Sequence, residues 1–167
     1  MIRTFGDPAC GIAAAVEALG DGWAPLILRE AFAGTQRFTD FQSRLGIARN
    51  LLSRRLAHLV DTGLLKKEDV GQYGERYEYR LTEKGWDFIH TLTALREWGE
   101  RWGVHGEHRA TTPLIDQTTQ EVLPPVRIRY ADGRPVPVQH LRSVPEPDAH
   151  DHTRRRAQDT MDGTPRT

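Results

Sequence analysis

Apolar residues recur at helical spacing in the first part of the chain, and this pattern predicts a series of short helices. The expected helices cover residues 7–20, 21–34, 39–45 and 48–62. In the first helix Asp7 and Pro8 suit the N-cap and the first helical position, and Asp21 is expected to cap the second helix. The third helix is expected to begin at a capping box made by Thr39 and Gln42. In the fourth, leucines gather on one face, which is typical of a helix that packs against a core.

After the fourth helix the period of the pattern changes from helical to alternating. Tyrosines alternate there with charged residues, as they do on a half-buried strand. Two strands are therefore expected over residues 64–70 and 76–81, joined by a turn at residues 71–74. Thr82 is then expected to cap one long helix that continues to Trp102.

This order of helices and strands is that of a winged helix-turn-helix, which is an α+β fold. In such a module the helix after the turn lies in the major groove of DNA, and the hairpin reaches the flanking backbone or the minor groove. We therefore expect a winged helix-turn-helix domain over residues 7–104, whose long last helix serves dimerisation.

Two further segments follow the expected domain. Asp132 and Gly133 are a two-residue turn signal between the apolar segments 126–130 and 136–138, so a small β-hairpin appendage is expected over residues 105–142. Residues 143–167 hold few apolar side chains among Pro, Asp, His and Arg. Such a segment cannot bury enough surface to offset its ordering entropy, so we expect a disordered tail.

The charges of the chain are balanced overall but uneven along its length. The 167 residues include 23 Lys and Arg against 23 Asp and Glu, while residues 37–67 carry seven basic and two acidic residues, a net charge of +5. A local basic block suits a module that contacts a polyanion with one face. No apolar run approaches the roughly 20 residues of a membrane span, and the N-terminus lacks the apolar stretch of a secretion signal. We therefore expect a cytoplasmic protein that does not contact a membrane.

The basic block falls on the elements that contact DNA in this fold. Arg can bond the edge of guanine, Asn the edge of adenine, and Ser either a base or a phosphate. The candidate base-reading residues, opposite the leucines of the fourth helix, are Arg49, Asn50, Ser53 and Arg54. The candidate phosphate contacts are Lys66, Lys67 and Arg76, and Arg37 completes the set of candidate DNA-binding residues.

The two adjacent arginines of the fourth helix have an alternative interpretation. Arg54 or Arg55 could instead pair with an acidic side chain of the same domain, and the candidate partners are Asp40, Asp61 and Glu30. We favour this alternative for Arg55, because the leucines that flank it place it nearer the buried face.

An ordered series of short motifs carries a family resemblance over about 93 of the 167 residues, from Cys10 to Trp102. The motifs are Cys10, Gly22-Trp23, Pro25-Leu26-Ile27-Leu28-Arg29-Glu30, Gly34, Arg37-Phe38, Gly46-Ile47, Leu52-Ser53-Arg54-Arg55-Leu56, Gly63-Leu64, Tyr79-Arg80-Leu81-Thr82, Lys84-Gly85 and Trp98. With this series the chain resembles the HxlR-type winged-helix transcriptional regulators, within the broader MarR-like class. The resemblance implies a homodimer that binds double-stranded operator DNA.

The resemblance also makes Cys10 a candidate redox sensor, because some members of the family sense quinones, aldehydes or oxidants through the matching cysteine. With Pro8 as the first helical residue, Cys10 would be the third, where the helix dipole and unpaired N–H groups favour the thiolate. The alternative is an inert, packed cysteine. Two departures from the family are a wing tip without its usual proline, Gly71-Gln72-Tyr73-Gly74, and an appendage without the cysteines that some relatives carry there.

An apolar stripe on the long helix is larger than one small core can cover, and monomers rarely expose such a surface. Its residues are Trp86, Ile89, Leu92, Leu95, Trp98 and Trp102. We expect it to form a dimer interface together with the first helix around residues 13–19.

Other classes of function have weaker support in the sequence. A winged helix can serve as a protein-docking module, and Trp86, Trp98 and Trp102 could line an aromatic pocket for a small effector of a MarR-like sensor. No nucleophile or phosphate-loop motif is present, so we expect no enzymatic activity and no cofactor. His105 and His108 have metal-ligand spacing without a further ligand set, so we expect no metal site.

Overall fold

The computed structural model describes residues 10–71, 76–103, 113–141 and 144 of the chain. They belong to two compact units: Asp21–Arg127 forms one, and the residues before Asp21 and after Arg127 form the other. The predicted domain boundaries near residues 104 and 142 fall outside the described residues and stay predictions.

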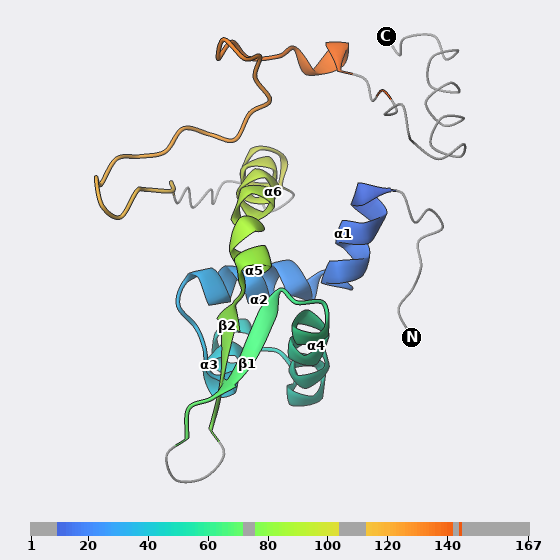
Figure 1. The fold of residues 1–167 in the computed structure, drawn as a ribbon, viewed down its shortest axis with the longest axis vertical. Coiled ribbons are helices and arrows are strands. Elements are labelled where there is room, and N and C mark those ends of the chain that lie inside the picture. Colours follow the sequence, from blue (N-terminus) through green and yellow to red (C-terminus); the bar gives the residue numbers. More distant parts are fainter. Residues whose placement is uncertain (1–9, 72–75, 104–112, 142–143, 145–167) are drawn as a thin grey trace. The chain divides into compact units, whose positions relative to one another are not determined.

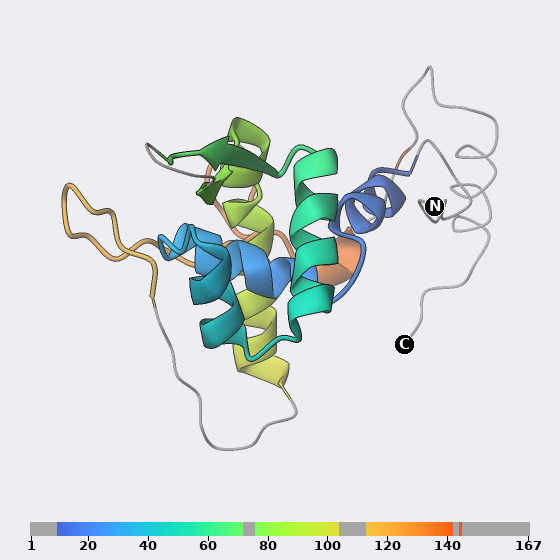
Figure 2. The same cartoon turned by 90° about the horizontal axis from the view of Figure 1, so that it is seen from below.

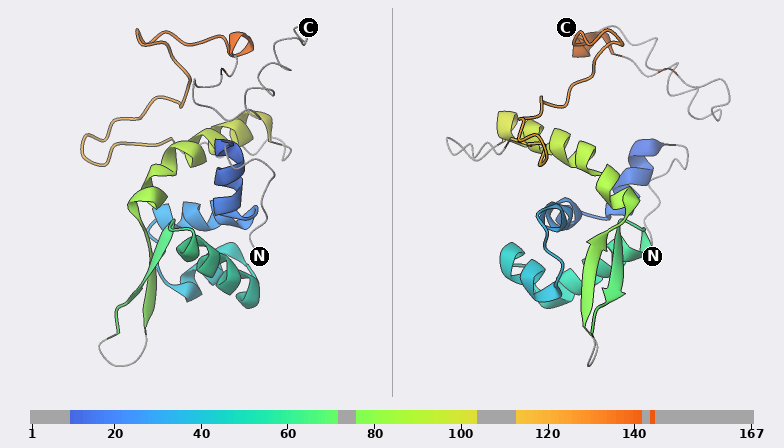
Figure 3. Two further views of the ribbon diagram at one scale, coloured as in Figure 1. Left: turned by 45° about the vertical axis from the view of Figure 1, so that its right-hand side comes forward. Right: turned by 60° about the vertical axis from the view of Figure 1, so that its left-hand side comes forward.

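The unit Asp21–Arg127 has the predicted α+β winged helix-turn-helix architecture (Figure 1). Its elements are α2 (Trp23–Phe32), α3 (Phe38–Leu45), α4 (Arg49–Asp61), β1 (Leu65–Asp69), β2 (Tyr77–Leu81), α5 (Glu83–Asp87) and α6 (Ile89–Trp102). The two strands pair antiparallel, with Leu65 opposite Leu81 and Asp69 opposite Tyr77. The hairpin points away from the helices, and α6 lies at the opposite end of this unit (Figure 1, Figure 3).

The helix-turn-helix proper consists of α3 and α4, which lie side by side and are joined by a short turn (Figure 2). Gly46 ends α3 with a φ of 60°, a left-handed conformation that glycine adopts without steric cost. The capping box predicted at Thr39 is wrong. Arg37 is the N-cap of α3, so Thr39 lies inside the helix, where its hydroxyl donates a hydrogen bond to Asp40 Oδ1 (3.2 Å).

The largest of the fully buried apolar side chains come from four elements of this unit. They are Ile27 and Leu28 on α2, Phe41 on α3, Leu52, Leu56 and Leu59 on α4, and Leu65 on β1. The predicted leucine face of α4 is therefore confirmed as its core face, which leaves the opposite face of the helix in solvent.

The predicted long helix is wrong in one respect, because it is divided at Phe88 into α5 and α6. Thr82 caps α5 as predicted, accepting a hydrogen bond from the Gly85 N–H (3.1 Å). The N–H of Phe88 then bonds the carbonyl of Gly85, three residues back (3.2 Å). A bond of this span makes a tighter 3₁₀-type turn, which interrupts the α-helical ladder.

The second unit contains α1 (Gly11–Leu19). Its N-cap is Cys10, so the prediction that Cys10 is the third residue of this helix is wrong. The first helical N–H groups have no side-chain cap from Cys10, and the carbonyl of Cys10 accepts the first helical bond, from the Ala14 N–H (3.0 Å). Asp7 and Pro8 lie outside the described residues.

The predicted appendage is only partly strand-like. In the second unit the chain turns at Asp132-Gly133 as predicted, and Arg129 pairs with Pro135 in an isolated bridge in place of two strands. Proline lacks an N–H group, which limits the ladder there. A short 3₁₀ helix, Val138–His140, follows. Of the predicted tail, 143–167, only Val144 is described.

Among the described residues no single helix is long and apolar enough to cross a membrane. Helices α1 and α2 meet the criteria of length and composition only when they are taken together, as two helices with a break between them. Of these, α2 is a core helix with five buried residues.

Candidate nucleic-acid interface

A shallow hollow of about 370 Å³ is formed by residues from α3, α4 and the β1–β2 hairpin. Its lining residues are Phe38, Arg49, Asn50, Ser53, Lys67, Tyr77 and Tyr79. Three of the predicted base-reading residues and one predicted phosphate contact therefore share one concave surface.

The polar residues of α4 reach this hollow because of their spacing along the helix. Arg49 and Ser53 are four residues apart, so they lie on the same face with Asn50 beside them, and all three are exposed. The side chain of Arg54 is also exposed, next to this face, and in the described part of the chain it forms no ion pair. The core leucines occupy the opposite face of α4, so the exposed face is available to a ligand.

Aromatic rings lie against two of the cations in the hollow. The guanidinium carbon of Arg49 is 5.4 Å from the centroid of the Phe38 ring. The Lys67 ammonium is 3.6 Å from the centroid of the Tyr77 ring. Both distances are within the range of a cation–π interaction.

The strand register separates the two lysines of β1. Lys67 pairs with Tyr79, and Lys66 pairs with Arg80. Because neighbouring residues of a strand point to opposite faces, Lys66 lies on the face away from the hollow. Its ammonium forms an ion pair with Glu68 (2.6 Å). The structure therefore does not bring Lys66 together with the base-reading candidates.

Arg37, another candidate DNA contact, belongs to a network of ion pairs on the face of the hairpin that is turned away from the hollow. Its Nε lies 3.7 Å from Glu78 Oε1, and Arg80 contacts both Glu78 (2.9 Å) and Glu68 (3.1 Å). The Glu78 side chain is largely buried, so its charge requires these partners. The hydrogen bond from Lys66 holds the pKa of Glu68 below its ordinary value. Arg37 thus links the start of α3 to β2 while its side chain remains half-exposed.

Tyr79 also lines the hollow. A phenol is protonated at neutral pH and can donate a hydrogen bond, and burial raises the pKa of Tyr79 further. The backbone N–H of Tyr79 bonds the Gln36 carbonyl (2.8 Å), which joins β2 to the segment before α3. The two sides of the hollow are therefore held together by the backbone.

The candidate phosphate contact Arg76 lies at the other end of the hairpin, just before β2, and is exposed. Its N–H donates to Asp69 Oδ1 (3.3 Å), and its carbonyl accepts from the Val70 N–H (2.7 Å). These bonds keep the two strands in register up to the wing tip, whose residues 72–75 are not among those described.

The expectation that Arg55 pairs within its own domain is right, but the predicted partners are wrong. Its guanidinium pairs with Asp21, immediately before α2, and not with Asp40, Asp61 or Glu30. The partner lies far from Arg55 in the sequence, so helical spacing could not identify it. Arg54, in contrast, points away from the core.

The predicted apolar stripe is divided between the domain and its surface. The Trp86 ring packs edge-on against Phe32, with 5.3 Å between centroids, and Ile89 and Leu92 are half-buried. Leu95, Trp98 and Trp102 on α6 are 49%, 63% and 67% exposed. Trp86 lies on α5 and lines a different hollow, with Phe32 and Leu81, whereas Trp98 and Trp102 lie on α6 and do not line that hollow. The three tryptophans therefore do not form one compact aromatic pocket.

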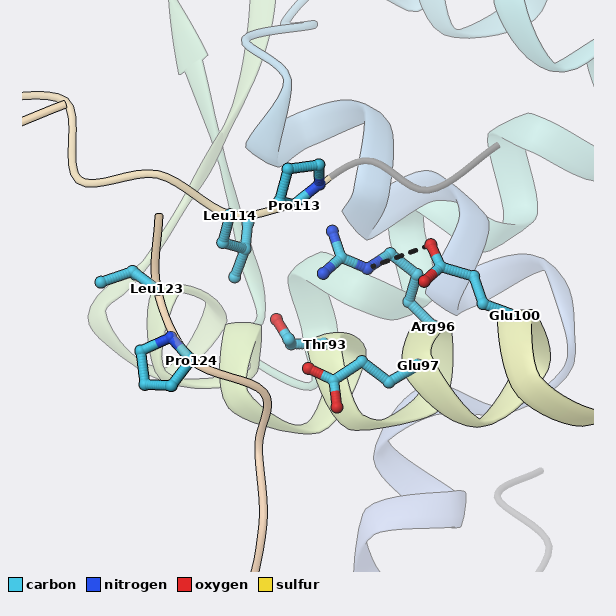
Figure 4. A pocket seen from close by; sticks show the side chains of 8 residues that line it. All are labelled: Thr93, Arg96, Glu97, Glu100, Pro113, Leu114, Leu123 and Pro124. Atoms are coloured by element: carbon cyan, nitrogen blue, oxygen red, sulfur yellow. Dashed lines mark ion pairs between the residues drawn. The ribbon is translucent and has the colours of Figure 1, made fainter. Parts of the chain in front are cut away.

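The opposite face of α6 is covered by the segment Pro113–Arg127 of the same unit (Figure 4). Glu97 Oε1 accepts a hydrogen bond from the Val126 N–H (3.1 Å), and Glu97 Oε2 accepts one from Arg127 (2.7 Å). A third hollow, of about 260 Å³, lies here. Figure 4 shows that Pro113, Leu114, Leu123 and Pro124 face the polar residues of α6 across it. The Arg96 guanidinium is directed toward Glu100 in this hollow (3.6 Å). Its lining carries one basic side chain, Arg96, and two acidic ones, Glu97 and Glu100.

The described residues contain no group of three or more His, Cys, Asp or Glu side chains that could hold a metal ion. His105 and His108 lie outside that part of the chain.

The aromatic residues of the interface were not among the predicted site residues. Phe38, Tyr77 and Tyr79 had been assigned only to the family motifs and to strand alternation. A pattern in the sequence could have indicated the two tyrosines. Alternation along the first strand places Lys67 and Asp69 on one face, and the register of a hairpin with a short turn places Tyr79 and Tyr77 opposite them. The position of Phe38 beside Arg49 depends on the packing of α3 on α4, which no local pattern specifies.

Known proteins with similar sequences are transcriptional regulators. The family model described as HxlR-like helix-turn-helix matches residues 18–107. The uncharacterised HTH-type transcriptional regulator Rv3095 of Mycobacterium tuberculosis is 44% identical over 88 residues, which are 53% of this chain and 56% of that protein. An uncharacterised HTH-type transcriptional regulator of Methanothermobacter thermautotrophicus is 37% identical over 100 residues, 59% of this chain and 76% of that protein. The match thus spans just over half the length of the mycobacterial relative.

Solved structures give the same result over a longer part of the chain. PA1607, a candidate transcription factor, has a TM-score of 0.75 and 33% identity, and the match covers 86% of this chain and 100% of that one. PA1374 from Pseudomonas aeruginosa, also a candidate transcription factor, has a TM-score of 0.61 and 36% identity over 88% of this chain and 99% of its own. The redox regulator HypR in its reduced form has a TM-score of 0.52 and 25% identity, covering 55% of this chain and 92% of its own.

The winged helix-turn-helix architecture, the polar outer face of α4 and the family match over residues 18–107 agree with one another. The chain belongs to the HxlR-like helix-turn-helix family of DNA-binding transcriptional regulators, which are not enzymes.

Proposed function

We propose that this protein is a homodimeric regulator that binds double-stranded operator DNA in the cytoplasm, with α4 in the major groove and the hairpin against the flanking backbone. The observation that carries the proposal is the hollow in which Arg49, Asn50 and Ser53 of α4 meet Lys67 of the hairpin. These residues combine donors and acceptors for base edges with a cation for phosphate. Arg54 and Arg76, both exposed, extend this set of contacts, and Arg37, exposed on the other face of the hairpin, is a further candidate contact.

The experiment is a selection of duplexes from a randomised library by the full-length chain, followed by affinity measurements on the enriched sequence. Asn50→Ala or Arg54→Ala is expected to cost about 1–3 kcal/mol on the enriched duplex and little on a random one, because base contacts carry the specificity. Failure to enrich any sequence would refute the proposal. If Asn50→Ala left DNA affinity unchanged and abolished binding to a protein, the protein-docking alternative would replace it.

The two lysines of β1 provide a matched pair for the phosphate contact. Lys67→Ala is expected to weaken binding to all duplexes alike and to reduce the slope of log K against log salt by roughly one unit. Lys66→Ala removes the same charge from the opposite face, where Lys66 pairs with Glu68, and is expected to have a smaller effect. Equal losses in the two variants would favour the sequence-based assignment of Lys66 to phosphate and contradict the role of the hollow.

The homodimer is supported by the outer face of α6. Leu95, Trp98 and Trp102 are spaced as one helical stripe and are largely exposed in a single chain. Monomeric proteins rarely expose adjacent large apolar side chains of this kind, so a second copy of the chain is the occupant we propose. Two-fold symmetry would then present two α4 helices to half-sites about one DNA turn, ~34–36 Å, or a multiple of it apart.

Oxidant or electrophile sensing through Cys10 is a second element of the proposal. The half-buried thiol lies at the N-terminus of α1, and the redox regulator HypR is 25% identical to this chain. The N-terminal end of a helix favours a thiolate, although an N-cap position offers this less directly than a place inside the first turn. Because Cys10 is the only cysteine of the chain, its products would be a sulfenic acid, an adduct, a mixed disulfide or a bridge between subunits.

A further inference from the structure

The hollow contains two cation–ring pairs, and each pair joins two different elements. Arg49 of α4 lies over Phe38, the first residue of α3, at 5.4 Å. Lys67 of β1 lies over Tyr77, the first residue of β2, at 3.6 Å. Both rings line the hollow and are half-buried, while both cations are exposed.

The degree of burial separates these rings from the core. Phe41, one turn after Phe38 on α3, is fully buried and fills the centre of the domain. Phe38 instead presents a ring to Arg49 at the surface. A ring in this position does more than exclude water from the core, because the negative face of its π system attracts the guanidinium.

A long cationic side chain at a surface samples many rotamers, and binding to DNA requires it to adopt one of them. A cation held over a ring before binding has already lost part of this freedom, so less affinity is lost when the contact forms. An exposed cation–π pair has a strength that corresponds to about two- to fivefold in an equilibrium constant.

We propose that Phe38 and Tyr77 are positioning residues of the DNA interface, Phe38 holding Arg49 for a base edge and Tyr77 holding Lys67 for a phosphate. This inference rests on the proposed function of the hollow. It assigns different effects to the two rings. Phe38 contributes to discrimination between sequences, whereas Tyr77 contributes to affinity for every sequence.

The experiment uses the full chain and a fluorescent duplex of the sequence that the wild-type protein enriches from a randomised library, with a random duplex for comparison. Phe38→Leu is expected to weaken binding about two- to fivefold on the enriched duplex and little on the random one. Phe38→Tyr keeps the ring and is expected to bind like the wild type. Tyr77→Leu is expected to weaken both duplexes about equally, and Tyr77→Phe, which lacks only the hydroxyl, neither of them.

A double-mutant cycle separates positioning from a structural role. In an Arg49→Ala background, Phe38→Leu is expected to cause no further loss, because the guanidinium that the ring holds is absent. In an Arg54→Ala background the loss is expected to remain two- to fivefold, since Arg54 does not line the hollow. Thermal unfolding of each variant checks that the domain is folded.

The outcomes distinguish this inference from the function on which it rests. If the wild-type chain enriched no sequence, the proposed function itself would fail. If it enriched a sequence and the Phe38→Leu and Arg49→Ala losses were additive, DNA binding would stand and the positioning role of Phe38 would be overturned. An equal loss on both duplexes with Phe38→Leu would overturn it as well.

Discussion

The guanidinium of Arg55 on α4 forms an ion pair with the carboxylate of Asp21, whose other oxygen accepts a hydrogen bond from the Trp23 N–H (3.0 Å). The Asp21 carboxylate thus caps α2 as predicted, although the N-cap position itself is occupied by the next residue, Gly22. The same carboxylate also holds the middle of α4. The two side chains are only 29% and 28% exposed. This contact ties the helix that carries the polar face to the start of α2.

Removal of this ion pair should destabilise the domain. Arg55→Ala is expected to lower the free energy of unfolding by about 1–3 kcal/mol, because a partly buried carboxylate loses its partner. Arg54→Ala is the matched control on the next position of the helix, and an exposed residue there should change stability by less than about 0.5 kcal/mol. Urea denaturation provides the measurement, and similar values for the two variants would contradict the structural role of Arg55.

Two glycines should respond in opposite directions to replacement by alanine. A Cβ at Gly85 would lie 2.2 Å from the carbonyl oxygen of Leu64, so Gly85→Ala requires α5 to move away from the start of β1. We expect a loss of more than about 2 kcal/mol in unfolding free energy. A Cβ at Gly99 on α6 meets no atom within 4 Å. Gly99→Ala should therefore stabilise the helix, by roughly 0.5–1 kcal/mol.

Attachment of the segment Pro113–Arg127 to α6 should depend on pH. Two opposing effects act on the pKa of Glu97. Burial acts to raise the pKa, but the hydrogen bonds from the Val126 N–H and from Arg127, together with the arginine charge, are stronger. The pKa of Glu97 therefore lies below its ordinary value of 4.5. Because the pKa of Glu97 is lowered in the contact, the ionised carboxylate stabilises the contact fully at pH values above the ordinary pKa. This stabilisation is lost as the pH falls through the lowered pKa. The protection of the Val126 amide from hydrogen exchange, taken relative to the intrinsic rate at each pH, should accordingly be high at neutral pH and fall in acid.

A neutral side chain should reproduce this effect at pH 7. Glu97→Gln is expected to accelerate exchange at Val126, because the amide cannot pair with the Arg127 charge. Glu121→Gln, at an exposed carboxylate of the same segment, is the control. Unchanged exchange in Glu97→Gln would show that the segment is held by its apolar contacts alone.

The dimer proposal predicts a change of mass. Trp98→Glu combined with Trp102→Glu should convert a dimer to a monomer in light scattering at micromolar concentration, because charges in an apolar interface lack partners. Val70→Glu, at a partly exposed valine after β1, should leave the mass unchanged. A wild-type chain that is monomeric under these conditions would refute the proposal.

The sensing proposal predicts that operator affinity depends on one thiol. Diamide or a quinone should weaken binding of the wild-type chain to its enriched duplex and leave Cys10→Ser unaffected, since no other cysteine is present. The same affinity in both proteins after treatment, or alkylation of Cys10 no faster than that of free cysteine at neutral pH, would assign the residue a structural role.

Local patterns in the sequence were sufficient for the architecture and for one face of the interface. The leucine spacing of α4 identified its core face, and the opposite positions identified Arg49, Asn50 and Ser53, because a helix of fixed period converts spacing into direction. The change from a helical to an alternating period after α4 identified the hairpin, because a strand also has a fixed period. These features depend on residues a few positions apart, which interact whatever the rest of the chain does.

Other features depend on contacts between elements that are distant in the chain, and these required the folded structure. Arg55 found its partner in Asp21, and Phe38 came to lie under Arg49, through the packing of α4 on its neighbours. The break at Phe88, where the N–H bonds the Gly85 carbonyl three residues back, was likewise not evident from the helical spacing of the apolar residues. Several acidic side chains were available to Arg55 at plausible spacing, and only the geometry of the packed core selects among them, because interaction energies fall steeply with distance and misalignment.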